Sequence, residues 1–151
     1  MIQQISEMVA TATNLLHPMM THFPLALLSA SYLLDILAHW WPKLRTSGWV
    51  LLILGTLGAI FAVITGNAAG ELFEDTKFGT VVETHQALAI ATTLIFSALL
   101  VWRFFARRKG NDPAEKWYYF IPATIGIGLL LLTGLYGGHM VYAFGLGVMG
   151  P

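Results

Sequence analysis

The sequence contains no cysteine and few charged residues. Without cysteine the chain cannot form disulfides, cysteine-ligated iron–sulfur clusters, a catalytic thiolate or a covalent C-x-x-C-H haem attachment. Charged residues make up 11% of the chain and the formal net charge is zero, whereas about a quarter of the residues of a soluble domain are charged. A neutral chain offers no electrostatic basis for binding nucleic acid.

Enzyme motifs are absent as well. The chain has no G-x-S-x-G, no P-loop and no G-x-G-x-x-G after a strand, and the stretch "GLYGGH" at 134–139 falls at an expected helix end. A self-contained hydrolase or transferase is therefore not expected. A carrier or a subunit of a larger complex fits this sequence better than an enzyme.

What the chain has in abundance is apolar residues, at 56% with a mean hydropathy of +0.68. A membrane-spanning helix needs about 20 mostly apolar residues, and four segments qualify, at about 22–41, 48–66, 85–105 and 117–139. We place Pro24 in the first turn of the first span and Pro42 just after its end. The sequence therefore predicts an all-α integral membrane four-helix bundle over residues 17–151.

The first 16 residues form a separate unit in this interpretation. They carry no Lys or Arg, so the basic region of a signal peptide is missing. Apolar side chains recur at helical spacing, at Ile2, Ile5, Val9, Ala12 and Leu16. We expect residues 1–16 to form a short amphipathic helix in the membrane interface, with a frayed terminus as the alternative.

The basic residues predict the orientation of the bundle. Seven of the eight lie around the connections after the first and third spans: Lys43, Arg45, Arg103, Arg107, Arg108, Lys109 and Lys116. The other side carries Glu7, Glu71, Glu74, Asp75 and Glu83, with Lys77 alone. Because basic loops stay in the cytoplasm, both termini should face outward. All five tryptophans then lie at the cytoplasmic interface, namely Trp40, Trp41, Trp49, Trp102 and Trp117.

In this orientation four of the five histidines share the outer side of the membrane. His22 and His85 begin the first and third spans, His139 ends the fourth, and His17 lies slightly further out. Helix lengths predict that His22, His85 and His139 lie at one level. Ionisable groups at membrane depth are costly and usually functional, although each of these histidines could also be an interfacial residue with a solvated tip.

Two histidines that face each other across a bundle can hold a b-type haem. The macrocycle needs small neighbours, and Gly66, Gly137 and Gly138 lie near the histidine level. Gly66 belongs to a stripe of small residues in the second span, which close helix packing would also explain: Gly55, Ala59, Ala62, Gly66 and Gly70. Haem propionates would find only Lys77 as a basic partner on this side, so backbone N–H groups, Tyr136, Tyr142 and water would have to serve.

A non-haem metal site is an alternative. Three or four histidines could bind zinc, copper or iron, and Met19, Met20 and Met140 would suit copper(I). Asp35 is a separate candidate inside the first span. We favour a structural pairing of Asp35 with His39, Lys43 or Arg45 over a role in proton conduction.

The sequence resembles a bacterial family of four-span membrane proteins catalogued as domain of unknown function 2231. The matching pieces cover nearly the whole chain, in order: "HP" at His17, "HFPLALL" at 22–28, Asp35, the glycine end of the second span at Gly66, "H-x-x-LA" at His85, and "GGHMVYAFGLGV" at 137–148. The resemblance implies a bacterial inner membrane. Relatives are sometimes joined to Rieske-type iron–sulfur domains, which implies a redox setting. They often carry an aliphatic residue where this chain has His139, so His139 is either an extra ligand or an incidental substitution.

We therefore expect a membrane b-type cytochrome that carries electrons near the outer face as a subunit or partner of a redox complex. It would hold one haem b, or two, through two of His17, His22, His85 and His139, with His22 and His85 as the first choice of pair. The alternatives are a non-haem metal protein, and a structural anchor or assembly subunit without a cofactor. Its expected partners are the lipid bilayer and a redox protein.

Overall fold

The computed structural model describes residues 2–73 and 76–146 of the chain, and their side chains from Leu16 onward with Leu72 excepted. It contains four long α-helices: α1 (Ile2–Leu37), α2 (Leu44–Gly70), α3 (Gly79–Arg108) and α4 (Trp117–Phe144). Two short 3₁₀ turns, η1 (Glu71–Phe73) and η2 (Pro113–Glu115), lie in the connections. All four helices are long and apolar enough to cross a membrane, α1 over Leu16–Leu37. The predicted all-α fold with four spans is confirmed.

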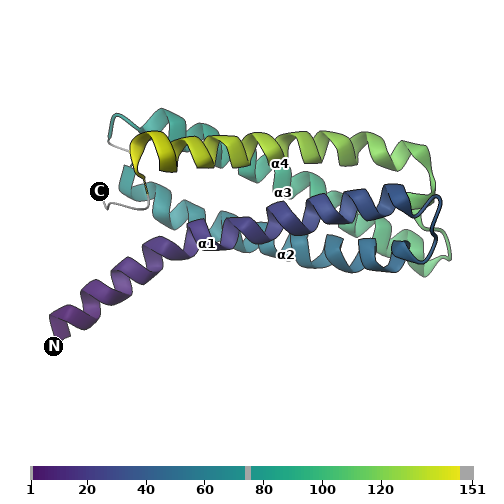
Figure 1. Cartoon of the computed structure of the whole chain (residues 1–151), viewed down its shortest axis with the longest axis horizontal. Helices are drawn as coiled ribbons and strands as arrows, with labels where there is room; N and C mark the ends of the chain where they lie inside the picture. Colours follow the sequence, from purple (N-terminus) through teal and green to yellow (C-terminus); the bar gives the residue numbers. More distant parts are fainter. Residues whose placement is uncertain (1, 74–75, 147–151) are drawn as a thin grey trace.

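The helices run up and down beside one another (Figure 1). Each packs against the helix before or after it in sequence, and α1 also contacts α4. The α1–α2 contact is the most extensive and the α1–α4 contact the least. The α1–α2 and α3–α4 connections lie at one end, whereas the α2–α3 connection and the end of α4 lie at the other. The two basic connections of the sequence therefore meet at the same end.

The N-terminal segment differs from its prediction. A separate amphipathic helix at 1–16 is not found, because residues 2–16 continue directly into the first span as part of the 36-residue α1. The first half of α1 projects beyond the bundle and meets the second half at a bend (Figure 1). Pro18 and Pro24 lie inside the helix, where each removes a backbone hydrogen bond and favours such a bend. Placing Pro24 in a first helical turn was therefore wrong, and α1 ends at Leu37, before Pro42.

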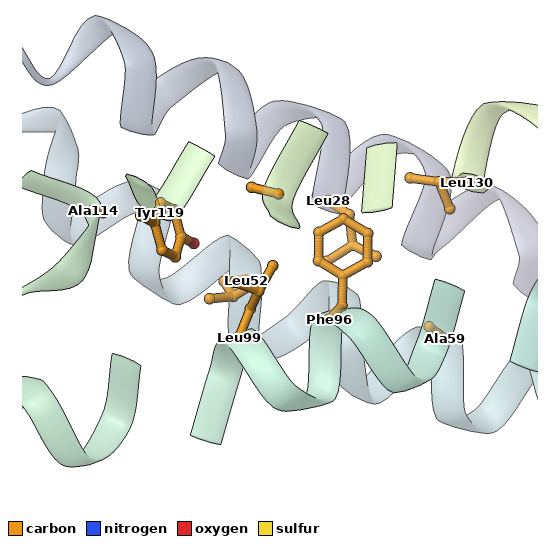
Figure 2. Close-up of a cluster of buried hydrophobic side chains, with 9 residues drawn as sticks. Leu28, Leu52, Ala59, Phe96, Leu99, Ala114, Tyr119 and Leu130 are labelled. Carbon is orange, nitrogen blue, oxygen red and sulfur yellow. The ribbon is translucent and has the colours of Figure 1, made fainter. Parts of the chain in front are cut away.

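The core lies along the bundle axis and draws on every helix. Figure 2 shows Leu28 and Phe96 together in the middle of this cluster, with Leu130 on one side and Leu52 and Leu99 on the other. Small residues on α2 let α1 approach closely, since a methyl group at Gly55 would come within 2.7 Å of the Leu28 side chain. Most other apolar side chains point outward, such as Leu135 of α4, which is 69% exposed. An apolar exterior of this kind is suited to lipid.

Candidate functional site

The end of the bundle opposite the basic connections holds a pair of histidines. His17 of α1 and His85 of α3 have ring centres 6.2 Å apart, with the ring planes at 81° to each other. His85 is 9% exposed and His17 is half-buried. The imidazole groups of two helices that are not neighbours in sequence thus meet inside the apolar bundle.

Each ring is held by a backbone carbonyl of a third or fourth helix. His17 Nδ1 lies 3.0 Å from the Ala62 oxygen of α2, and His85 Nδ1 lies 3.1 Å from the Thr133 oxygen of α4. Because a carbonyl only accepts hydrogen bonds, Nδ1 must carry the proton in both rings. In the neutral imidazole, Nε2 then has a free lone pair and can bind a metal.

Two glycines let the rings fit. A methyl group at Gly66 would come within 2.6 Å of His17 Cε1, and one at Gly137 within 3.2 Å of His85 Cε1. Gly66 and Gly137 therefore make room for the histidine rings themselves. A methyl group at Gly138, by contrast, would meet no atom within 4 Å, so Gly138 does not contact either ring.

The structure does not bring the other two predicted histidines to this pair. His22 is exposed, and its Nδ1 lies 2.9 Å from the Pro18 oxygen of its own helix. His139 is exposed too, and its ring packs against Phe144 at 5.0 Å between centres. The residue that faces His85 is His17, whereas the sequence favoured His22.

The set of ligands decides which metal chemistry fits. Within the described residues no group of three or more His, Asp or Glu side chains comes together in a way that could hold a metal ion, while structural zinc sites use four ligands and catalytic zinc sites three. Haem iron needs only one or two axial ligands from the protein. Two imidazoles on opposite sides of one metal have centres about 6 Å apart, since each metal–nitrogen bond is about 2 Å long. The 6.2 Å between the His17 and His85 ring centres has this length, and the two rings meet edge to face.

At the other end of the bundle the structure contains a buried charge cluster that sequence reasoning found only in part. The guanidinium of Arg103 donates to both carboxylate oxygens of Asp35, at 2.6 and 3.0 Å, and to both oxygens of Asp112, at 2.9 and 3.2 Å. Arg107 contacts Asp112 as well. The expected structural pairing of Asp35 exists, but its partner is Arg103 and not His39, Lys43 or Arg45.

Aromatic rings and small residues enclose this cluster. The Trp49 and Tyr119 rings lie 5.5 and 5.6 Å from the Arg103 guanidinium carbon, which allows cation–π attraction. A methyl group at Gly48 would come within 2.5 Å of the Asp35 carboxylate. Asp112 lies outside the spans. Burial alone would raise its pKa, but hydrogen bonds and attraction from Arg103, with further bonds from Ala114 N–H and Arg107, hold the pKa below its usual value.

Four long apolar helices packed as a bundle, with paired ionisable groups inside, define a multi-pass membrane protein. Residues 14–150 match the family model described as predicted membrane protein (DUF2231), and the chain belongs to this family. No curated protein and no solved structure matches it. The resemblance inferred from the sequence motifs is thus confirmed, and the family description assigns no function.

Proposed function

We propose that this protein is a b-type cytochrome-like electron carrier in which His17 and His85 hold one haem. The observation that carries the proposal is the pair of imidazoles, one buried and one half-buried, with ring centres 6.2 Å apart and with each Nδ1 fixed by a carbonyl, which leaves Nε2 unprotonated. Bound haem would supply reversible one-electron transfer between ferric and ferrous iron.

The surroundings of the pair suit metal binding and leave one side of the bundle less tightly packed. The two carbonyl hydrogen bonds fix the ring orientation and raise the basicity of Nε2, as in other metal-bound histidines. Among the four helix pairs in extended contact, α1 and α4 contact each other least, so a flat ring that separates them disrupts less packing than one between the other pairs. One haem is proposed, because His22 and His139 have no histidine opposite them in the described part of the chain.

The orientation is part of the proposal. Seven of the eight Lys and Arg residues lie at the end with the α1–α2 and α3–α4 connections. By the positive-inside rule this end faces the cytoplasm of a bacterial inner membrane, and the histidine pair faces the periplasm. Electrons would then be exchanged with a partner at the outer face, as a subunit or partner of a redox complex.

Visible spectroscopy of the protein purified in detergent tests the proposal. A sharp α band on reduction with dithionite, with about one haem per chain, is expected. His17→Ala and His85→Ala should each abolish the low-spin spectrum, whereas His22→Ala and the control His39→Ala should retain it. A colourless protein with stoichiometric copper or zinc would overturn the haem proposal, and a colourless, metal-free protein that co-purifies with a complex would favour an anchor. If His22→Ala loses haem and His17→Ala keeps it, the ligand pair is wrong.

A further inference from the structure

An open groove of about 770 Å³ runs between the start of α3 and the end of α4, at the histidine end of the bundle. Its apolar lining includes Phe78, Val81 and Phe144, and its polar lining includes Thr84, Tyr136 and His139. Phe78 and Phe144 lie 5.1 Å apart between ring centres. The groove lies at the ends of two membrane-spanning helices. A ligand dissolved in the membrane, with its headgroup at the interface, can reach a groove in this position.

The charges at this end of the bundle argue for a neutral headgroup. Lys77 lines the groove and is the only Lys or Arg at this end among the residues that the structure describes, and its ammonium lies over the Phe78 ring at 5.0 Å from the centre. The exposed carboxylates of Glu71 and Glu83 lie at the same end. These two carboxylates, which lie outside the groove lining, offset the single positive charge of Lys77. The groove therefore has no excess positive charge to hold an anionic lipid, and a neutral group with acceptor oxygens suits it better.

The polar side chains in the groove suit a ligand with carbonyl oxygens. Tyr136 and His139 can each donate a hydrogen bond, and both are exposed at the groove surface. The aromatic side chains Phe78 and Phe144 offer contact area for a flat ring. The volume is that of a small-molecule site, for which about 300–1,000 Å³ is usual.

The groove is also next to the histidine pair. Thr84 precedes His85 in α3, and Tyr136 precedes Gly137, where an added methyl group would come within 3.2 Å of the His85 ring. A ligand in the groove would therefore contact a residue adjacent in sequence to His85, one of the two proposed haem ligands. The membrane-soluble molecules that combine a flat neutral ring, two carbonyl oxygens and redox activity are quinones.

We propose that this groove binds the headgroup of a membrane quinone, with Tyr136 and His139 donating hydrogen bonds to its carbonyl oxygens and Phe78 and Phe144 contacting its ring. The choice of a quinone over another neutral lipid rests on the proposed electron-transfer function. The groove itself does not depend on it, since the lining residues are separate from His17 and His85.

Binding of a decyl-substituted benzoquinone to the purified full-length protein, measured by calorimetry in detergent, tests the site. Saturable binding of one quinone per chain is expected. His139→Leu and Tyr136→Phe should each weaken it about tenfold, the effect of one lost hydrogen bond. The matched controls are His39→Leu, an exposed histidine at the opposite end, and Tyr142→Phe, an exposed tyrosine on α4 outside the groove.

A second kind of variant separates loss of the binding site from loss of the folded structure. Ala143 is exposed and lines the groove, so Ala143→Trp should fill the groove and abolish binding while the thermal unfolding midpoint stays near that of the wild type. Equal quinone binding in wild type, His139→Leu and Ala143→Trp would overturn the proposal, as would competition by phosphatidylethanolamine at equal concentration. Because binding is read without the haem spectrum, a coloured protein without quinone binding refutes the groove alone. A colourless protein that binds quinone refutes the haem alone.

Discussion

Arg103 of α3 and Asp35 of α1 form a two-pronged ion pair in which both side chains are shielded from the surroundings, with exposures of 0% and 1%. The same guanidinium also binds Asp112 in the α3–α4 connection. Arg103 of α3 therefore forms ion pairs with both α1 and the loop that follows α3. A charge buried to this extent is stable only while its partners are present.

Replacing Asp35 with Asn should destabilise the protein strongly. The change removes the charge that compensates Arg103 from α1, and breaking a buried pair costs about 3–5 kcal/mol. We expect the lower end of that range, because Asp112 remains bound to Arg103. Thermal unfolding in detergent measures the effect, with Glu115→Gln in η2, an exposed carboxylate, as the control. A midpoint for Asp35→Asn equal to that of Glu115→Gln would show that the ion pair contributes no stability.

The stability should depend on pH through Asp112. Burial raises the pKa of Asp112, but hydrogen bonds and charge attraction from Arg103, with a hydrogen bond from Arg107, lower it by more. The pKa in the folded protein therefore lies below its usual value. A carboxyl group with a lowered folded pKa stabilises the fold fully above its unfolded pKa, about 3.9, and this contribution is lost as the pH falls through the folded value.

The difference in unfolding midpoint between wild type and Asp112→Asn should therefore be constant from pH 7 to about pH 5. Below about pH 4 the difference should shrink, because the wild-type carboxyl group also becomes neutral. Midpoints measured across this range decide the matter. If the difference in midpoint between the two proteins stays the same down to pH 2, the mutation acts through altered packing or hydrogen bonding and not through the loss of the Asp112 charge.

Gly48→Ala should disturb the same cluster through sterics alone. The added methyl group would come within 2.5 Å of Asp35 Oδ1 and 3.0 Å of its Cγ, so the carboxylate must move off Arg103. We expect a loss of about 1–3 kcal/mol, typical of overpacking. Gly128→Ala in α4 is the matched control, since a methyl group there meets nothing within 4 Å and alanine is the better helix former. Equal unfolding midpoints for the two variants would contradict the prediction.

Gly66→Ala should weaken haem retention without touching either proposed ligand. A methyl group at this position would lie 2.6 Å from His17 Cε1, so the ring must turn away from the Ala62 carbonyl that fixes it. Losing such a supporting contact costs about 10–100-fold in metal affinity, measured by titrating haem into the stripped protein. Gly138→Ala is the control, because a methyl group there reaches no neighbour within 4 Å. Wild-type affinity in Gly66→Ala would argue against His17 as a ligand.

The sequence predicted the elements well because the membrane constrains them strongly. Apolar runs of spanning length give helices wherever water cannot satisfy the backbone, and the basic residues Lys43 and Lys116 mark connections that do lie at one end. The prediction of a separate N-terminal helix was wrong because no residue ends the helix near Leu16. Pro18 and Pro24 lie inside α1, which bends and continues.

The partners inside the bundle were harder to predict, because hydropathy gives the depth of a residue but not the direction in which it points. His17 and His22 are five residues apart, so their side chains point about 140° apart around α1. Only one of them can face α3, and the choice depends on how α1 is rotated against Gly66 of α2. Arg103 was missed as the partner of Asp35 for the same reason, although a basic residue inside the third span was visible in the sequence.

The enclosed position of Arg103 also constrains how the protein enters the membrane. An isolated α3 would leave the Arg103 guanidinium near the end of the span without the carboxylates that neutralise it, which is unfavourable at the membrane boundary. Its neutralising carboxylates come from the helix inserted first, through Asp35, and from a loop made after α3, through Asp112. Pairing of α3 with α1 is therefore favoured as soon as both helices are in the membrane, and Asp112 completes the cluster once the following loop has been made.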